Sequence, residues 1–134
     1  MIRRLLILLG ASLLLTACGT DGSALRRDHA YVVEWIGERP LIDNSHLTLT
    51  LGTDGRAYGN AGCNHWFANY TVDKERIDFV RPGSTRKMCA PALMEQEQRF
   101  LEALPHVVRW SIADNGQLQL WPEQGKPIRL WREE

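Results

Sequence analysis

The stretch His46-Leu47-Thr48-Leu49-Thr50-Leu51 alternates strictly between leucine and polar residues. This period of two places the three leucines on one face of an extended chain, so we predict a half-buried β-strand over residues 46–51. Thr53-Asp54-Gly55-Arg56 follows, and Asp-Gly between apolar segments favours the positive φ that a tight hairpin needs. The chain is therefore expected to return antiparallel over residues 57–59.

Strand-forming composition recurs along most of the chain, in runs separated by polar turns. Further strands are expected at 31–36, 70–72, 77–80, 106–112, 117–121 and 128–131. The same period of two turns Trp110 toward the core, but it places Trp121 and Trp131 on the face opposite to their leucine neighbours. Unless a helix or loop covers them, Trp121 and Trp131 form a candidate surface for a partner protein, a lipid tail or a glycan.

Residues 91–104 depart from the strand pattern. Their apolar residues recur near helical spacing: Leu93, Met94, Phe100, Leu101 and Leu104. Pro91 suits a first helical turn and Pro105 ends the run, so a single helix is expected. Its carboxylates are expected to be solvated: Glu95, Glu97 and Glu102, with Arg99 as an ion-pair partner for Glu95. Hairpins with one helix indicate an α+β domain whose helix covers one face or end of an antiparallel sheet.

The first 17 residues look like a bacterial lipoprotein signal. Arg3 and Arg4 precede an apolar run of about 13 residues, which as a helix would reach about 20 Å against about 30 Å of bilayer hydrocarbon. Leu15-Thr16-Ala17-Cys18 resembles the lipobox, in which the cysteine thiol receives a diacylglyceryl group, the chain is cut before it and the new amine is acylated, with palmitate as the expected fatty acid. Two or three acyl chains make the anchoring effectively permanent. The resemblance to such lipoproteins implies that Gly19, in place of aspartate, directs the protein to the outer membrane, where the domain would face the periplasm. The alternative to a lipobox is an ordinary secretory signal.

Cleavage at this site leaves one domain of ordinary size. Residues 18–28 are polar and glycine-containing, which indicates a flexible, lipid-anchored tether, and residues 29–134 are expected to form the domain. Loss of Arg3 and Arg4 leaves 14 basic against 16 acidic residues. This slightly acidic balance gives no indication of a nucleic-acid partner.

With Cys18 committed to lipid, Cys63 and Cys89 are the remaining thiols in an exported chain, and we expect them to form a disulfide. A closed loop of about 27 residues would contribute about 3.5 kcal/mol in the chain-entropy model. Cys63 and His65 with Cys89 could alternatively be metal ligands or a Cys/His nucleophile pair, but a second close-spaced ligand pair is missing. The sequence also lacks Gly-x-Ser-x-Gly, His-Glu-x-x-His and a phosphate loop. We therefore expect a protein that is not an enzyme and has no cofactor or metal.

Several of these residues together resemble the META domain, the HslJ-like heat-shock lipoprotein family. The resemblance rests on Gly62-Cys63-Asn64, Tyr70, Thr85-x3-Cys89-Ala-Pro, Glu97, Phe100-Leu101 and Gly116-Gln-Leu-Gln-Leu120, over about residues 31–132. It implies an antiparallel, partly open β-barrel or strongly curved sheet with one packed helix. It implies an envelope setting linked to stress tolerance and no catalytic residues. Gly62, Cys63, Asn64, Thr85 and Cys89 are then motif positions with structural roles, Gly62 permitting a bend and Asn64 bonding its own turn.

The expected function is that of a non-catalytic, membrane-tethered binding module with an envelope protein partner. The alternative is a carrier that holds an acyl chain or another small apolar ligand inside the barrel, lined by Leu47, Leu49, Leu118 and Leu120. A less favoured alternative is a cysteine hydrolase, which needs a free thiol at Cys63.

Overall fold

The computed structural model describes residues 24–134. The expected signal peptide (residues 1–17), the expected lipidation site Cys18 and the rest of the expected tether up to residue 23 lie outside this part. The strands are β1 (Ala30–Ile36), β2 (Arg39–Pro40), β3 (Thr48–Leu51), β4 (Arg56–Asn60), β5 (His65–Asp73), β6 (Arg76–Ser84), β7 (Val107–Ile112), β8 (Leu118–Pro122) and β9 (Ile128–Arg132). One α-helix, α1 (Pro91–Ala103), is followed by a 3₁₀ turn at Leu104–His106.

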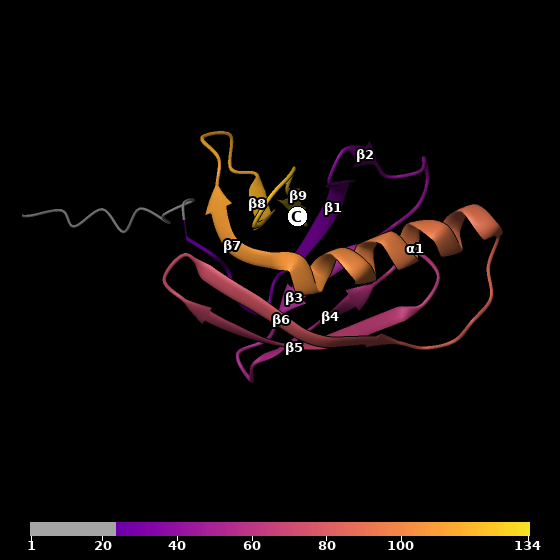
Figure 1. The fold of residues 1–134 in the computed structure, drawn as a ribbon, viewed down its shortest axis with the longest axis horizontal. Coiled ribbons are helices and arrows are strands. Elements are labelled where there is room, and N and C mark those ends of the chain that lie inside the picture. Colours follow the sequence, from indigo (N-terminus) through magenta and orange to yellow (C-terminus); the bar gives the residue numbers. More distant parts are fainter. Residues whose placement is uncertain (1–23) are drawn as a thin grey trace, which may run out of the picture.

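The strands form one antiparallel meander that closes on itself (Figure 1). Each strand from β3 to β8 pairs with the next in sequence, and β1 pairs with both β3 and β9, so eight strands complete the ring. Among the strands of residues 24–134, short β2 pairs with β1 alone. The seam between β6 and β7 is the thinnest, with one register pair at Arg76 and Arg109. The expected antiparallel architecture with one helix is confirmed. The barrel was expected to be partly open or a strongly curved sheet, but pairing of β1 with β9 closes it.

The β3–β4 hairpin forms where the alternation predicts it. Gly55 adopts a φ of +82° in the turn, and Leu47, Leu49 and Leu51 are fully buried. Thr48 is also buried, because its hydroxyl accepts the N–H of Asn60 at 3.0 Å. These contacts draw β3 and β4 together closely.

Gly59 makes this close approach possible. A Cβ atom at Gly59 would lie 2.1 Å from the carbonyl oxygen of Thr48. That oxygen already accepts a hydrogen bond from Trp66 Nε1 at 2.8 Å, and Trp66 is fully buried. The position therefore requires glycine because any side chain would displace the strand that holds the central tryptophan.

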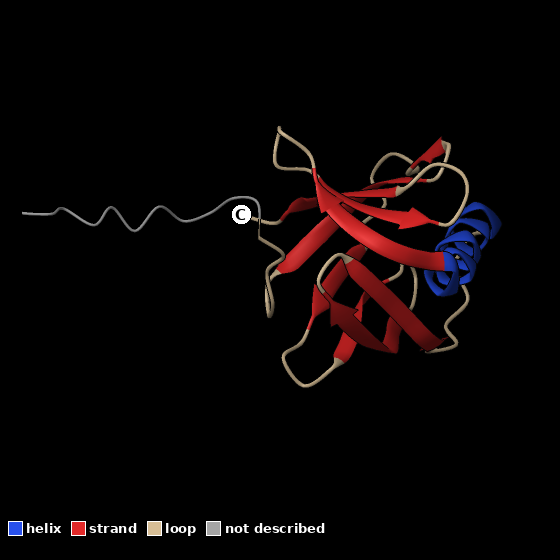
Figure 2. Cartoon of the chain, turned by 60° about the vertical axis from the view of Figure 1, so that its left-hand side comes forward, coloured by secondary structure: helices blue, strands red, loops and turns tan. Residues whose placement is uncertain are grey.

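Helix α1 covers one end of the barrel, and the C-terminus lies at the opposite end (Figure 2). Pro91 lies in the first helical turn as expected. Phe100 is fully buried and meets Trp66 edge to face, with ring centres 5.2 Å apart. The helix therefore closes the core through an aromatic contact.

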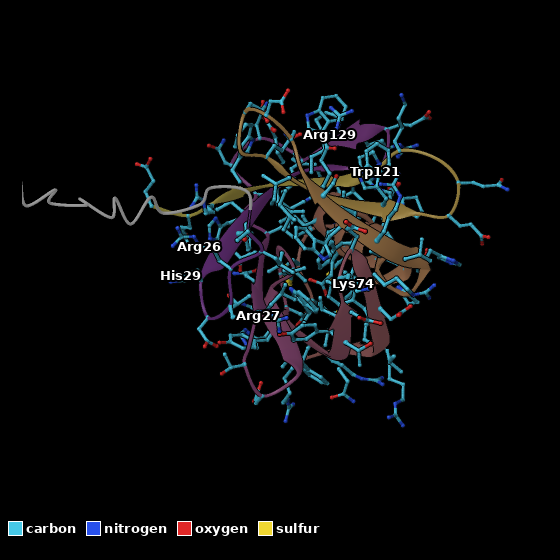
Figure 3. All side chains as sticks on the ribbon, turned by 90° about the vertical axis from the view of Figure 1, so that its left-hand side faces the viewer. Arg26, Arg27, His29, Lys74, Trp121 and Arg129 are labelled. Atoms are coloured by element: carbon cyan, nitrogen blue, oxygen red, sulfur yellow. A yellow bond between two sulfur atoms is a disulfide. The ribbon has the colours of Figure 1, made fainter. Side chains whose placement is uncertain are left out.

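The start of the described chain lies at the barrel end away from α1 (Figures 1 and 2). Arg26, Arg27 and His29 are grouped there in Figure 3. The segment contacts the barrel even though it belongs to the stretch expected as tether: Leu25 packs against the core, and the Asp28 N–H donates to the Leu51 carbonyl at 2.8 Å. Within residues 24–134, no helix combines the length and hydropathy needed to cross a membrane.

Candidate functional site

Two segments that carry motif residues meet the buried face of α1. They are the turn 61–64 between β4 and β5 and the loop 85–90 between β6 and α1. Cys63 and Cys89 form a disulfide with a Cα–Cα distance of 6.0 Å, which ties the turn to the start of the helix. This bond leaves Cys63 without the thiol that a nucleophile requires.

Glu97 is the centre of this cluster. Its side chain was expected to be solvated, and that expectation is wrong: only 3% of the residue is exposed. Oε2 accepts the backbone N–H groups of Cys63 at 3.2 Å and Asn64 at 2.7 Å, and Oε1 accepts Nδ2 of Asn64 at 2.7 Å. Burial of a carboxylate is tolerated here because three donors surround it.

Asn64 connects the turn to the loop 85–90. Its Oδ1 accepts the Thr85 hydroxyl at 3.1 Å and the Lys87 N–H at 2.6 Å, and its Nδ2 also donates to the Lys87 carbonyl at 2.9 Å. The Asn64 side chain, which was expected to bond its own turn, therefore bonds the loop and the helix instead, while its backbone carbonyl accepts the Ala61 N–H at 2.8 Å within the turn. Thr85 Oγ1 also accepts the His65 N–H at 3.1 Å.

Gly62 provides the bend that brings these groups together. Its φ is +104°, a conformation that favours glycine, so the expected bend is confirmed. The Gly62 N–H donates to Asn60 Oδ1 at 2.8 Å. Gly62, Cys63, Asn64, Thr85 and Cys89 thus form one constellation with Glu97. Within it, hydrogen bonds link Cys63, Asn64 and Thr85 to one another or to Glu97, and the disulfide adds Cys89.

Gln96 is a further buried polar residue that the sequence interpretation missed. It is fully buried beside Glu97, and its Oε1 accepts the Ile42 N–H at 2.7 Å. Its Nε2 donates to the Ser45 hydroxyl at 3.0 Å. Gln96 therefore holds the segment between β2 and β3 against the helix, as Glu97 holds the turn 61–64.

The META domain family model matches residues 23–134, which include this entire constellation. The chain belongs to the META domain family. Among solved structures, it is similar to a protein from Burkholderia xenovorans determined by NMR, at 26% identity and a TM-score of 0.68, covering 80% of this chain and 83% of that one. A second NMR structure, at 22% identity and a TM-score of 0.60 over 77% of this chain and 87% of that one, shares the fold. No significant match was found among curated proteins.

Next to the constellation, this META domain has an apolar groove of about 490 Å³. We call it the Met88 groove; its lining includes Phe67, Met88 and Met94 together with Arg86 and Lys87. Met88 is 82% exposed and Phe67 41% exposed. The carboxylate in the lining belongs to Glu97, which is buried and hydrogen-bonded, so the exposed charge at the groove is positive.

The outer surface of the META domain extends this apolar area along the sheet. Tyr58 lies opposite Phe67 in the register of β4 and β5, and both are exposed. The ring of Phe67 rests on Gly83 of β6, where a Cβ atom would lie 2.8 Å from the ring. The sequence contained a signal for this surface, because Tyr58 and Phe67 each alternate with buried residues along their strands.

The two tryptophans proposed as a binding surface lie elsewhere in the META domain, on the strands β8 and β9. Trp121 is half-buried beneath the guanidinium of Arg109, 4.6 Å from the ring centre, and its Nε1 donates to Ser111 Oγ at 2.9 Å. Trp131 is 36% exposed and donates to Glu34 at 2.8 Å. Trp121 and Arg129 appear together in this part of the barrel in Figure 3. Trp131 is therefore the more accessible of the two.

Side chains occupy the barrel interior where a carried ligand was considered. Leu47, Leu49, Leu118 and Leu120 are fully buried in one cluster with Trp66 and Phe100. Trp110 is half-buried and packs against this cluster, and its Nε1 donates to the Lys74 carbonyl at 2.8 Å. Within residues 24–134, no group of three or more His, Cys, Asp and Glu residues is placed to hold a metal ion.

Proposed function

We propose that this META-domain protein is a non-catalytic, lipid-anchored binding module of the cell envelope. In this proposal, Cys18 carries the acyl chains, and Gly19 directs the protein to the outer membrane, where the domain faces the periplasm. The module binds another envelope protein and contributes to envelope integrity or stress tolerance, as the HslJ-like resemblance implies. It needs no cofactor and no nucleic acid.

The observation that carries the proposal is that the loop 85–90 is fixed against α1 and yet exposes an apolar side chain. The disulfide and the hydrogen bonds of Asn64 and Glu97 fix the loop 85–90 against the helix. That loop in turn presents Met88, a large apolar side chain left 82% exposed. Fixing an exposed apolar side chain in advance lowers the entropy cost of binding, so the arrangement suits a recognition surface.

The position of the groove fits an anchored protein. The loop between β6 and α1 lies at the end of the molecule away from the start of the described chain (Figure 1). A chain tethered through residues before position 24 would therefore present the Met88 groove away from the bilayer. This orientation favours a protein partner in the periplasm over the surrounding lipid.

The chemistry of the groove also defines the partner. Phe67, Met88 and Met94 would receive apolar side chains, and Arg86 and Lys87 would face acidic ones. We therefore expect a partner segment with apolar residues flanked by Asp or Glu. The filled barrel core favours this surface over an internal ligand as the site of binding.

The lipid anchor is tested with Cys18→Ser. Because the variant lacks the thiol that is acylated, we expect it to lose incorporation of a clickable palmitate analogue and to leave the outer-membrane fraction. Metabolic labelling and membrane fractionation measure both effects. Cys63→Ser is the matched control, and it should remain labelled. Equal labelling of wild type and Cys18→Ser would contradict the anchor.

The binding role is tested by Met88→Asp in a deletion strain. We expect deletion to sensitise cells to envelope stress, wild type to restore tolerance, and Met88→Asp to restore little of it because a carboxylate replaces the apolar contact. Glu123→Ala, at another exposed loop, is the control and should complement fully. Survival under detergent or heat stress is the measurement, with thermal unfolding to confirm that the variants fold. Full complementation by Met88→Asp would contradict a role for the groove.

A further inference from the structure

A second cleft, of about 480 Å³, lies between the C-terminal half of α1, the end of β1 and the β8–β9 hairpin. Its lining includes four residues of the barrel core: Ile36, Val107, Leu120 and Ile128. The cleft is therefore an opening at the edge of the packed core, with an apolar floor. Its volume lies within the range of small-molecule sites.

Arg99 of α1 lines this cleft and has unused hydrogen-bonding capacity. Of the buried side-chain nitrogen and oxygen atoms in residues 24–134, Arg99 Nε is the one without a hydrogen-bond partner. Nη1 of Arg99 lies 3.8 Å from Glu95 Oε1, an oxygen that Arg39 also approaches at 3.6 Å. Because Glu95 is shared and 67% exposed, this weak pair leaves most of the guanidinium charge available.

Lys126 adds a second positive charge to the lining of the cleft, and Glu102 is its acidic residue. Oε1 of Glu102 accepts a hydrogen bond from Gln98 Nε2 at 2.8 Å on the exposed side of the helix. A partly exposed guanidinium beside an apolar floor matches a carboxylate carried on an apolar chain.

We propose that this cleft, which we call the Arg99 cleft, binds an amphiphilic monocarboxylate of the fatty-acid type. The carboxylate pairs with the partly exposed guanidinium of Arg99, and the alkyl chain lies over Ile36 and Ile128 at the cleft floor. The site is distinct from the barrel interior, whose leucines are packed, and from the Met88 groove. The inference does not depend on the proposed partner binding.

Methyl NMR of the full-length protein, held in lipid nanodiscs and titrated with hexanoate, tests this proposal. We expect saturable shifts at the methyl groups of Ile36, Val107, Leu120 and Ile128, with Ile77 unchanged because it is absent from the cleft lining. Hexylamine, with the same chain and the opposite charge, should bind at least tenfold more weakly.

Variants of Arg99 and Arg39, the two arginines that approach Glu95, test which guanidinium binds the carboxylate of hexanoate. Arg99→Gln should weaken hexanoate binding at least tenfold, and Arg99→Lys should weaken it less because the charge is kept. Arg39→Gln, which contacts the same glutamate from outside the cleft, should bind as wild type does; thermal unfolding checks that each variant folds. The proposal would be overturned if the shifts did not saturate or were confined to other methyl groups. It would also be overturned if hexylamine bound as tightly as hexanoate, or if Arg99→Gln left hexanoate binding unchanged.

Discussion

Replacing Glu97 with alanine is expected to lower the free energy of unfolding by about 4 kcal/mol. The reason is that the carboxylate accepts three hydrogen bonds, from the backbone of Cys63 and from the backbone and side chain of Asn64. Alanine would leave these donors facing a cavity beside α1, and each buried donor without an acceptor is costly. For a domain of this size, thermal unfolding should shift down by about 15 °C.

The matched control is Glu102→Ala, on the exposed side of the same helix, where the glutamate accepts one hydrogen bond from Gln98. It should change the free energy of unfolding by less than about 1 kcal/mol. Glu97→Gln should fall between the two, because its amide keeps one acceptor but turns an N–H toward the donors. An unfolding free energy for Glu97→Ala within 1 kcal/mol of wild type would show that Glu97 does not hold the turn.

Opening the Cys63–Cys89 disulfide should lower the free energy of unfolding by about 3 kcal/mol. The bond joins residues 26 apart in sequence, so its loss frees a long loop in the unfolded chain. Denaturant titrations with and without a reducing agent measure the effect, and intact mass after alkylation confirms the redox state. Coincident unfolding midpoints for the oxidised and reduced protein would contradict this prediction.

The effects of the disulfide and Glu97 should not add. Cys63 donates its N–H to Glu97 and its sulfur bonds Cys89, so both interactions fix the same turn. In the Cys63→Ser/Cys89→Ser background, Glu97→Ala should therefore cost less than it does in wild type. Such coupling would identify one cooperative cluster that supports the loop carrying Met88.

Local patterns in the sequence were sufficient to predict the β3–β4 hairpin and the helix α1. The alternation over residues 46–51 and the Asp54-Gly55 turn set β3 and β4, and Pro91 and Pro105 bracket α1. These signals operate between neighbours along the chain, where periodicity and backbone preference dominate. They do not report which distant strands pair.

The full extent of several strands and the closure of the barrel could not be predicted from local sequence patterns. β6 continues to Ser84 through Arg81, with a φ of +53°, and through Pro82, which together read as a break in the sequence. β5 begins at His65, before the segment recognised as strand-like. Closure of the ring depends on pairing of β1 with β9, a contact between the two ends of the domain that no local pattern encodes.

The sequence predicted the buried face of α1 but not the burial of the two polar residues on it. Leu93, Phe100 and Leu104 form a stripe with helical spacing, and positions 96 and 97 fall in its middle. Because Gln96 and Glu97 are polar, composition indicated solvent exposure. Burial is favourable only because the turn 61–64 and the segment around Ile42 and Ser45 supply their hydrogen-bond partners, which the fold alone brings near.

Site-specific photocrosslinking in living cells tests the central claim most directly. A photoreactive amino acid replaces Met88 in one strain and Glu123 in a second, both exposed loop positions of the same domain. We predict that position 88 gives a discrete adduct with one envelope protein, that position 123 does not, and that Arg86→Glu/Lys87→Glu reduces the adduct by removing the positive charge beside the groove. Identical products from both positions, or no adduct at position 88 under envelope stress, would contradict a binding function for the Met88 groove.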